Sequence, residues 1–317
     1  MRYSQMKNGV GSRTAMPSRK STGRGETAGD KAITIAGAVE ACRRRLSAVS
    51  DAPWLEARLL TGHVTGLDAS AIVAYGDNLL ETNRVQKLAG LTARRLSGEP
   101  LAYLVGFKEF CGLRIAVNKD VLVPRPESEE LVAAVVADWR GRAPDIVDLG
   151  TGSGAIACAL AHALPCARLW AVDASSDALM VARANVAENL YADRIAIMQS
   201  DLFAALSRDL TFDAIVANLP YVAEGDPDLS ADVREHEPSV AIYGGADGLD
   251  VYRRMFAAAP QRLRASGSVY CECGPRNAYE LAALARSAFV GGTVEVRDDI
   301  AGSARMVIVS LAEPVRR

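Results

Sequence analysis

The 317-residue sequence has little histidine and no regularly spaced cysteine. Its three histidines and six cysteines include no Cys-x-x-Cys pair and no spacing typical of zinc ligands, so we expect no metal site. The cysteines stand in apolar patterns, which predicts reduced, buried thiols in a cytoplasmic protein. No apolar run approaches the roughly 18 residues of a membrane span, and no signal-peptide core is evident, so we expect a soluble chain.

The sequence also lacks a strong charge of either sign. Lys and Arg number 36 against 38 Asp and Glu, which gives a net charge of −2. Without a large positive field, direct nucleic-acid binding is not expected. Half of the residues are apolar and the length suits two domains, so the chain can bury a sizeable core.

Residues 1–30 are rich in Ser, Gly, Thr, Lys and Arg, with no acidic residue before Glu26. Such a composition cannot bury a core and predicts a disordered tail. A transit peptide and an over-long start are the alternatives.

Residues 31–105 show a helical pattern, with apolar residues three or four apart. Asp51 is expected to cap a second helix, whose apolar residues include Trp54, Leu55 and Leu59. The segment predicts a small helical bundle without evident chemistry. It serves either as a scaffold or, as we prefer, in recognition of a protein partner.

Residues 106–124 change to an alternating pattern and predict a β-hairpin that links two domains. Its turn is expected at residues 118–120. A helix with an acidic first turn should follow. Arg125, directly before that helix, is a candidate ligand contact; the alternative is an ion pair with Glu127 or Glu129.

The second part of the chain, residues 125–317, is organised around residues 145–160. An apolar run ends there at Asp148, and a turn with three glycines and an Ala-rich helical stretch follow. The glycines allow a sharp turn and a close approach to a ligand, and the helix start supplies free N–H groups. This strand–turn–helix unit suits an adenosyl ligand; a dinucleotide-binding loop and a purely structural turn are the alternatives.

Three later apolar stretches also end near polar residues: 168–172 before Asp173, 195–198 before Asp201, and 212–217 before Asn218. An acidic residue after the second strand suits ribose hydroxyls. Because ligands bind at the carboxyl ends of strands in open α/β sheets, the four ends together indicate one site. Helices are expected between all of these strands, and two terminal strands should close a doubly wound sheet with a hairpin.

Residues 222–248 have little periodicity and predict a long loop of the kind that often forms a lid. A metal site at Glu235, His236 and Glu237 is a poor hypothesis, because neighbours in sequence rarely converge on one ion. We expect a solvated loop there.

The tetrapeptide Asn218-Leu219-Pro220-Tyr221 follows the fourth strand. The Asn side-chain oxygen and the next backbone carbonyl are two acceptors with fixed geometry, and Pro220 stiffens the turn. Tyr221 offers a flat face. The group suits a planar –NH2, such as a carboxamide or an exocyclic amine; the alternative is a plain turn after a strand.

Several motifs occur in order along the chain: Arg94-Arg95, residues 98–103, Glu109-Phe110, residues 123–129, 148–154 and 218–221, Glu237-Pro238 and residues 244–249. Together they resemble the glutamine N5-methyltransferases that modify peptide chain release factors. The resemblance covers nearly all of the chain from about residue 32. It implies the α/β fold of class I methyltransferases: a Rossmann-like, doubly wound, seven-stranded sheet with an N-terminal helical bundle and a connecting β-hairpin.

By this resemblance, the cofactor is S-adenosylmethionine, and the substrate is the glutamine of the Gly-Gly-Gln loop of a release factor, docked by the helical domain and hairpin. The residues implied to bind the cofactor are Gly150, Thr151, Gly152, Ser153, Gly154, Asp173, Asp201, Leu202 and Asn218. The implied catalytic residues are Asn218, Pro220 and Tyr221, and the glutamine amide is held by these, by Leu219 and, as a further candidate, by Arg125. We expect a cytoplasmic monomer.

Two positions depart from the family pattern. Leu219 replaces the first proline of the usual Asn-Pro-Pro-Tyr, but it keeps the backbone carbonyl, so we expect activity with a looser turn. A glutamine common after the Glu-x-Gly of the sixth strand is not found in residues 272–277. Asn-Leu-Pro-Tyr also resembles rRNA adenine dimethyltransferases, so adenine in RNA or DNA is one alternative substrate. A ribosomal-protein glutamine is another. The altered tetrapeptide also permits a non-catalytic module that binds the methyl donor.

Overall fold

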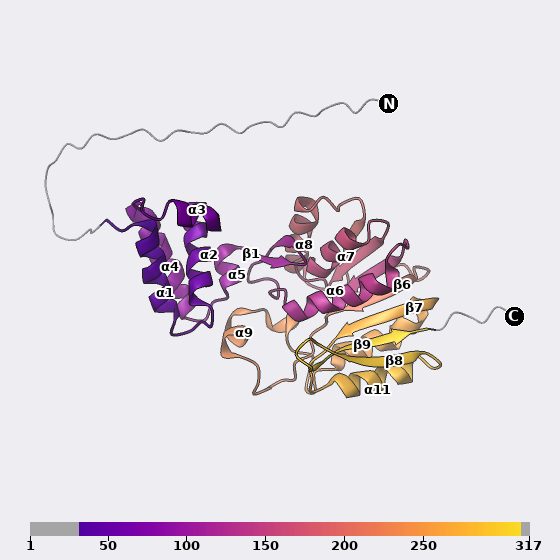
Figure 1. The fold of residues 1–317 in the computed structure, drawn as a ribbon. Helices are drawn as coiled ribbons and strands as arrows, with labels where there is room; N and C mark the ends of the chain where they lie inside the picture. Colours follow the sequence, from indigo (N-terminus) through magenta and orange to yellow (C-terminus); the bar gives the residue numbers. More distant parts are fainter. Residues whose placement is uncertain (1–31, 312–317) are drawn as a thin grey trace, which may run out of the picture. The chain divides into compact units, whose positions relative to one another are not determined.

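The computed structural model describes residues 32–311 (Figure 1). The tail predicted for residues 1–30 lies outside this range. Within residues 32–105 the chain forms five helices: α1 (Ile35–Leu46), α2 (Pro53–Thr65), α3 (Ala69–Ala74), α4 (Thr82–Leu96) and α5 (Leu101–Val105). Their apolar residues form a core of their own, so a helical bundle precedes the sheet.

The helices of the bundle begin at residues that suit a helix start. Thr34 and Asp68 cap α1 and α3 by accepting from backbone N–H groups of the first turn. The predicted cap of α2 by Asp51 is wrong. Ala52 stands at that position without a side-chain bond, and Pro53 begins the helix because its fixed φ suits the first turn.

Helix α2 buries only part of its apolar surface. Ala57, Leu60 and Val64 face the bundle core, whereas Trp54 and Leu55 are 52% and 57% exposed. The three buried residues recur on one face of the helix, whereas Trp54 and Leu55 in its first turn are left exposed. The bundle therefore presents large apolar side chains to its surroundings.

A β-hairpin follows the bundle, but its turn lies earlier than predicted. β1 (Phe107–Phe110) pairs antiparallel with β2 (Leu113–Ala116). The turn is formed by Cys111 and Gly112, with φ of 49° and 75°. Residues 118–120 instead form a local turn closed by a bond from Asp120 N to the Asn118 side chain, because a short polar side chain can accept from the backbone two residues on.

The rest of the chain forms one seven-stranded sheet within the described residues. Its strands are β3 (Asp145–Leu149), β4 (Arg168–Asp173), β5 (Ile195–Gln199), β6 (Phe212–Ala217), β7 (Leu263–Glu272), β8 (Thr293–Asp298) and β9 (Ala304–Ser310). The spatial order is β5-β4-β3-β6-β7-β9-β8. β9 runs antiparallel to β7 and β8, and the other pairings are parallel. This confirms the doubly wound sheet with a closing hairpin.

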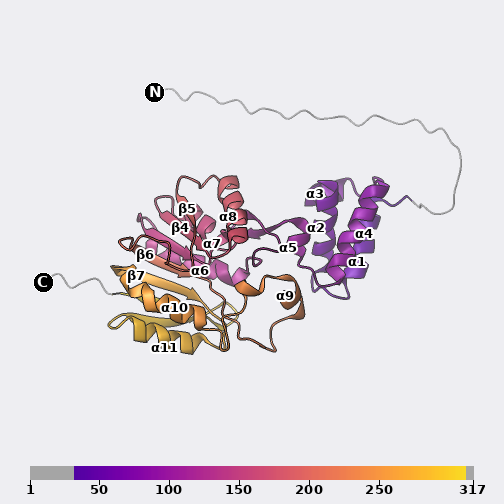
Figure 2. The ribbon, with the colours of Figure 1, turned by 180° about the vertical axis from the view of Figure 1, so that it is seen from behind.

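Helices cover both faces of the sheet (Figure 2). One face carries α6 (Pro126–Trp139), α7 (Ala155–Ala163) and α8 (Ser176–Glu188), and the other carries α10 (Asp250–Ala258) and α11 (Ala278–Ala288). In β3, Ile146 packs with the first group and Val147 with the second. All five residues of β3 are buried, as expected of a central parallel strand. None of the helices within residues 32–311 has the length and hydropathy needed to cross a membrane.

The helix predicted between β5 and β6 is absent from the described residues 200–211, which form turns. Leu202 has a φ of 50°, which a right-handed helix cannot accommodate. The Ser200 hydroxyl accepts from Ala205 N at 2.8 Å and closes a tight turn instead. This irregular connection keeps Asp201 and Leu202 at the carboxyl end of β5.

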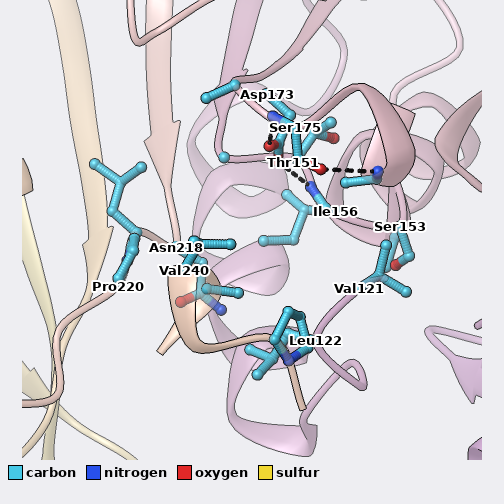
Figure 3. Close-up of a pocket in the computed structure, with 18 of the residues that line it drawn as sticks. Val121, Leu122, Thr151, Ser153, Ile156, Asp173, Ser175, Asn218, Pro220 and Val240 are labelled. Atoms are coloured by element: carbon cyan, nitrogen blue, oxygen red, sulfur yellow. Dashed lines mark hydrogen bonds between the residues drawn. The ribbon is translucent and has the colours of Figure 1, made fainter. Parts of the chain in front are cut away.

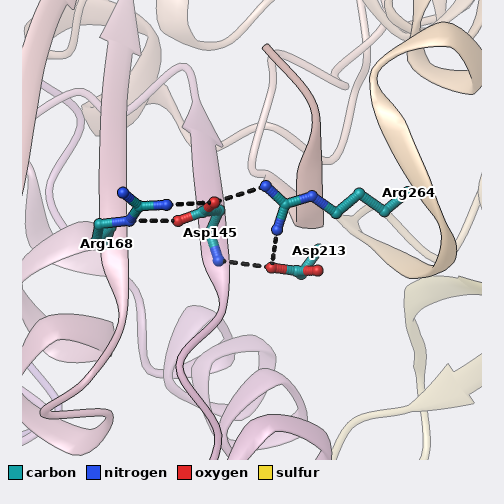
Figure 4. A network of polar contacts seen from close by, with 4 residues as sticks. All are labelled: Asp145, Arg168, Asp213 and Arg264. Atoms are coloured by element: carbon teal, nitrogen blue, oxygen red, sulfur yellow. Dashed lines mark hydrogen bonds and ion pairs between the residues drawn. The ribbon is translucent and has the colours of Figure 1, made fainter.

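A charged network joins the amino ends of four strands (Figure 4). Asp145 of β3 bonds Arg168 of β4 at 2.7 Å and Arg264 of β7 at 2.6 Å. Arg264 also lies 2.5 Å from Asp213 of β6. Burial would raise the pKa of Asp145, but the bonds with the two arginines outweigh it and lower that pKa. The network holds these strand starts together, and their carboxyl ends meet at the opposite edge.

The cysteines match their predicted burial only in part. All six are free thiols, and four of them are buried. Cys111 is half-buried in the hairpin turn, and Cys166 is exposed in the turn before β4. Both positions are loop positions, where an apolar sequence pattern says little about burial.

Candidate active site

A cavity of about 270 Å³ opens at the carboxyl ends of β3, β4, β5 and β6. Its walls come from the β3–α7 turn, these strand ends, residues 120–125 before α6, and residues 238–241 after α9 (Ala231–His236) (Figure 3). Of the predicted site residues, the cavity is lined by Arg125, Gly150, Thr151, Gly152, Ser153, Asp173, Asp201, Leu202, Asn218, Leu219 and Pro220. Gly154 and Tyr221 lie outside this lining.

The β3–α7 turn needs glycine where it faces the cavity. Gly152 has a φ of 54°, and a Cβ there would meet nothing within 4 Å, so its bare backbone is open to a ligand. A Cβ on Gly150 would lie 3.0 Å from the Leu219 side chain, so this turn also packs against the tetrapeptide. Gly154 lies behind the cavity, where a Cβ would press on Ala182 of α8 at 3.3 Å.

Asp173, at the end of β4, both closes the glycine turn and faces the cavity. Its Oδ2 accepts from Gly152 N and its Oδ1 from Ser175 N, each at 2.9 Å (Figure 3). Each carboxylate oxygen keeps a further lone pair. Asp173 can therefore accept bonds from the hydroxyls of a ligand while it holds the turn.

The end of β5 contributes Asp201 and Leu202 to the cavity wall. Asp201 forms an exposed ion pair with Arg254 of α10, which also lines the cavity. Leu202 adds apolar surface beside this pair. The wall at this strand end therefore combines an apolar contact with a carboxylate already paired to a cation.

Asp148 supports the glycine turn from inside the protein. It is fully buried; its Oδ2 accepts from the Thr151 hydroxyl at 2.6 Å, and its Oδ1 has no hydrogen-bond partner. Burial, the largest cause, and the charge of Asp173 together raise the pKa of Asp148 to about 7, although the Thr151 bond opposes the rise. Asp148 does not line the cavity.

The first three residues of the tetrapeptide 218–221 line the cavity, and Tyr221 is held elsewhere. The Tyr221 hydroxyl donates to Glu272 Oε1 at 3.2 Å, and its carbonyl accepts from Asn277 Nδ2 at 2.8 Å. Burial, and then the charge of Glu272, raise the pKa of Tyr221, so its hydroxyl stays a donor. The predicted stacking role of the Tyr221 ring stays a prediction.

A buried polar chain holds the Asn218 side chain. Asn218 Nδ2 donates to Ser128 Oγ at 3.0 Å, and Ser128 donates to Glu272 Oε2 at 2.6 Å. Ser128 is 3% exposed and Glu272 1%. Neither residue has a role predicted from the sequence. Ser128 stands in the motif of residues 123–129 and Glu272 in the Glu-x-Gly that begins at residue 272. Membership of these motifs was the only feature of the sequence that pointed to a role for them.

Arg125 pairs with Glu237, not with the acidic residues of its own helix. Glu237 is buried, and its other carboxylate oxygen accepts from Val123 N at 3.0 Å. These bonds fasten the end of α9 to the segment before α6, and the following Pro238 and Val240 line the cavity. Pro238, Val240 and Ala241 of residues 222–248 thus form part of the cavity wall, and a lid stays a prediction. The solvated loop expected at residues 235–237 is only partly right, because α9 runs to His236 and Glu237 is buried. Among the residues that the structure describes, no His, Cys, Asp or Glu cluster could hold a metal.

The glycines of residues 244–248 support the tetrapeptide from behind. A Cβ on Gly244 would clash with the carbonyl of Pro220, and a Cβ on Gly248 would clash with the carbonyl of Tyr221. Gly248 also has a φ of 81°. Only bare backbone fits against these carbonyls, so this glycine-rich segment fixes the position of the tetrapeptide.

Comparisons with known proteins show the family of the chain. Two family models match the chain: the PrmC N-terminal domain over residues 38–106, and the methyltransferase small domain over residues 128–234. A release factor glutamine methyltransferase of Rhodopirellula baltica is 38% identical over 271 residues, 83% of this chain and 91% of the relative. One from Gloeobacter violaceus is 41% identical over 82% of this chain and 91% of the relative. The chain belongs to the release factor glutamine methyltransferase family.

It is therefore a methyltransferase, and membership of this family implies S-adenosylmethionine as the methyl donor. Among solved structures, the hMettl16 catalytic domain in complex with the MAT2A 3'UTR hairpin 6 is similar, with a TM-score of 0.51. It is 16% identical and covers 76% of this chain and 87% of that one. This likeness supports the fold alone.

The structure shows what the family departure at Leu219 changes. Leu219 N donates to the Tyr252 hydroxyl at 3.3 Å, a bond that a proline cannot make. Its side chain is buried, 4% exposed, and lies against the glycine turn. The bond to Tyr252 restrains the backbone at Leu219, as a proline ring would do at that position. It therefore limits the looser turn that we expected from the sequence.

The second departure has a partial substitute. Residues 272–277 contain no glutamine, but Asn277 supplies a side-chain amide. Its Nδ2 donates to the Tyr221 carbonyl, and its Oδ1 accepts from Gly274 N at 3.1 Å. One amide thus ties the end of the tetrapeptide to the loop after β7.

Proposed function

We propose that this chain transfers the methyl group of S-adenosylmethionine to the side-chain amide nitrogen, N5, of the glutamine in the Gly-Gly-Gln motif of peptide chain release factors. The observation that carries the proposal is the hydrogen bond that holds the side-chain amide of Asn218. Its Nδ2 is engaged by Ser128, so its Oδ1 is the atom left to accept a hydrogen from an incoming amide in the cavity.

The methyl donor fits the residues of the cavity. The open backbone at Gly152 admits a ligand chain beside the turn, and Asp173 has lone pairs for ribose hydroxyls. Leu202 and Ile156 offer apolar surface for an adenine ring. We assign the cofactor to these residues together with Gly150, Thr151, Ser153, Asp201 and Asn218, all of which line the cavity.

When bound, S-adenosylmethionine supplies an activated methyl group on a sulfonium, so the chain's own residues have mainly to position the substrate. The Asn218 side-chain oxygen and the Leu219 carbonyl would hold the two amide hydrogens and direct the nitrogen at the methyl group. The same acceptors would stabilise positive charge growing on that nitrogen. The extra proton would then pass to water.

Recognition of the release factor is assigned to the helical bundle and hairpin. Trp54 and Leu55 of α2 are more than half exposed, and exposed large apolar side chains are common at sites of protein contact. A cytoplasmic location and a monomeric state stay predictions.

A label-transfer assay tests the function. The protein is incubated with tritiated S-adenosylmethionine and a purified release factor, beside the same factor with the Gly-Gly-Gln glutamine replaced by alanine. We expect label only on the unmodified factor. Label on neither factor contradicts the proposal, and label on ribosomal proteins or RNA in parallel incubations would identify the substrate instead.

A further inference from the structure

The Asn218 side chain is tied to two buried residues, Ser128 and Glu272. Ser128 lines the cavity, and Glu272 lies outside its lining. Asn218 Nδ2 bonds Ser128 Oγ at 3.0 Å, and Ser128 Oγ bonds Glu272 Oε2 at 2.6 Å. Ser128 comes from the first turn of α6 and Glu272 from the end of β7. Helix α6 packs against β7, and the chain of bonds links these two elements to the tetrapeptide.

The direction of these bonds follows from what each group can donate. Glu272 accepts from Ser128 at one oxygen and from Tyr221 at the other, so both of its oxygens act as acceptors. Burial raises the pKa of Glu272, and these two bonds and the charge of Arg305 oppose that rise and favour the ionised form. The single hydroxyl hydrogen of Ser128 is thereby committed to Glu272. Toward Asn218, Ser128 can then only accept, and only the nitrogen of the Asn218 amide can donate to it.

We propose that Ser128 and Glu272 are positioning residues that fix which way the Asn218 amide faces, and so select a substrate amide over a carboxylate. With Nδ2 held by Ser128, Asn218 presents Oδ1, an acceptor, to the cavity. An amide –NH2 can donate to that oxygen, whereas a glutamate carboxylate meets an acceptor and is disfavoured. This inference rests on the proposed function, because it takes the glutamine side chain as substrate.

The opposite orientation would reverse this preference. Without the Ser128 hydroxyl, the Asn218 amide can turn, and its nitrogen can then face the cavity. That nitrogen is a donor, which suits a carboxylate and leaves a substrate amide without its acceptor. Loss of the Ser128 bond should therefore alter both turnover and the discrimination between the two side chains.

The test compares Ser128→Ala with Ser128→Thr, which keeps a hydroxyl. The readouts are kcat/KM for the release factor, inhibition by a release factor whose Gly-Gly-Gln glutamine is replaced by glutamate, and the Kd for S-adenosylmethionine. For Ser128→Ala we expect kcat/KM to fall about tenfold, as for loss of one buried hydrogen bond. The glutamate-substituted factor should inhibit it about threefold or more better than it inhibits the wild type, because a donor now faces the carboxylate.

Two further variants complete the design. Ser128→Thr should restore most of the activity and the weak inhibition, and Ser287→Ala, an exposed serine on α11, controls for the substitution itself. Glu272→Leu removes the acceptor behind Ser128 and should shift inhibition in the same direction as Ser128→Ala. The Kd for S-adenosylmethionine should stay within about twofold of the wild type in the folded variants.

The outcomes separate this inference from the proposed function. A wild-type chain that labels no release factor overturns both. A wild-type chain that labels the factor, together with a Ser128→Ala variant of unchanged kcat/KM and unchanged inhibition, overturns the orienting role alone. A Ser128→Ala variant that loses activity and cofactor affinity together, without better inhibition by the glutamate form, also overturns it, because the role would then be structural.

Discussion

The backbone nitrogen of Leu219 lies 3.3 Å from the hydroxyl of Tyr252, which also bonds the carbonyl of Ala217 at 3.2 Å. Tyr252 is fully buried. One hydroxyl thus joins the end of β6 to the tetrapeptide at the position where the family pattern has proline. The site has a tether that a proline would make unnecessary.

Tyr252→Phe should destabilise the fold and reduce turnover, because it leaves the buried Leu219 N–H without a partner. We expect a loss of about 1–3 kcal/mol in the free energy of unfolding. When residue 219 is proline, it has no N–H that could be left without a partner. Tyr252→Phe should therefore reduce the free energy of unfolding by less in a Leu219→Pro background. Urea unfolding of the four chains of this cycle measures the coupling. Equal costs in both backgrounds would show that the bond does not matter.

Gly248→Ala should displace the tetrapeptide, because a Cβ there would clash with the Tyr221 carbonyl. We expect kcat to fall about tenfold or more while S-adenosylmethionine still binds. Gly225→Ala is the matched control, since Gly225 has a similar φ of 79° but nothing within 4 Å of a Cβ. If the two variants lose the same activity, backbone strain and not the clash is responsible.

Arg125→Met should loosen the wall of the cavity formed by residues 238–241. It leaves the buried Glu237 carboxylate without its cation, and we expect the free energy of unfolding to fall by about 2 kcal/mol or more. This is less than for a fully buried pair, because Arg125 is itself 33% exposed. Arg253→Met breaks an exposed ion pair between α10 and Asp247 and should change the stability much less, because solvent screens such pairs. Thermal unfolding and limited proteolysis compare them. Equal destabilisation would contradict the anchoring role.

Asp148 should make stability depend on pH. Its pKa is about 7 in the folded chain against an ordinary value of 3.8, so between these values the folded state keeps a proton that the unfolded chain loses. The contribution to stability is therefore full below about pH 4 and is lost as the pH rises toward about 7. Asp148→Asn should remove this slope, at most about 1.4 kcal/mol per pH unit. If the free energy of unfolding depends on pH in the same way for both chains between about pH 4 and pH 7, the raised pKa of Asp148 is refuted.

Trp54→Ala combined with Leu55→Ala should weaken the encounter with the release factor. Both side chains are more than half exposed, so we expect little loss of stability and a rise of about tenfold in KM for the factor, with kcat nearly unchanged. Val290→Ala, at a side chain that is 91% exposed after α11, is the control. An unchanged KM would place the docking surface elsewhere.

The sequence predicted the sheet well because its strands are short apolar runs bounded by turns. Phe212–Ala217 was predicted at its observed bounds, and the two terminal strands that close the sheet as a hairpin were predicted as well. The missing helix after β5 and the position of the hairpin turn depended on positive-φ residues that are not glycine, Leu202 and Cys111. Nothing in residue type announces such a conformation.

The candidate site was predicted where it depends on strand ends and glycines. Asp173 and Asn218 fall at the same edge because parallel strands share a direction, which the pattern alone determines. The contacts of Ser128, Glu237 and Tyr252 could not be predicted, because their partners lie far away in sequence. Such tertiary bonds need the packing of α6, α9 and α10, which periodicity does not specify.

The most direct test of the proposed reaction is to locate the transferred methyl group. A release factor is incubated with the chain and S-adenosylmethionine, and its Gly-Gly-Gln peptide is sequenced by tandem mass spectrometry. We predict one methyl group on the side-chain nitrogen of the glutamine, and none when Asn218→Ala replaces the wild-type chain. A methyl group on any other residue, or an equal yield with Asn218→Ala, would contradict the proposed function.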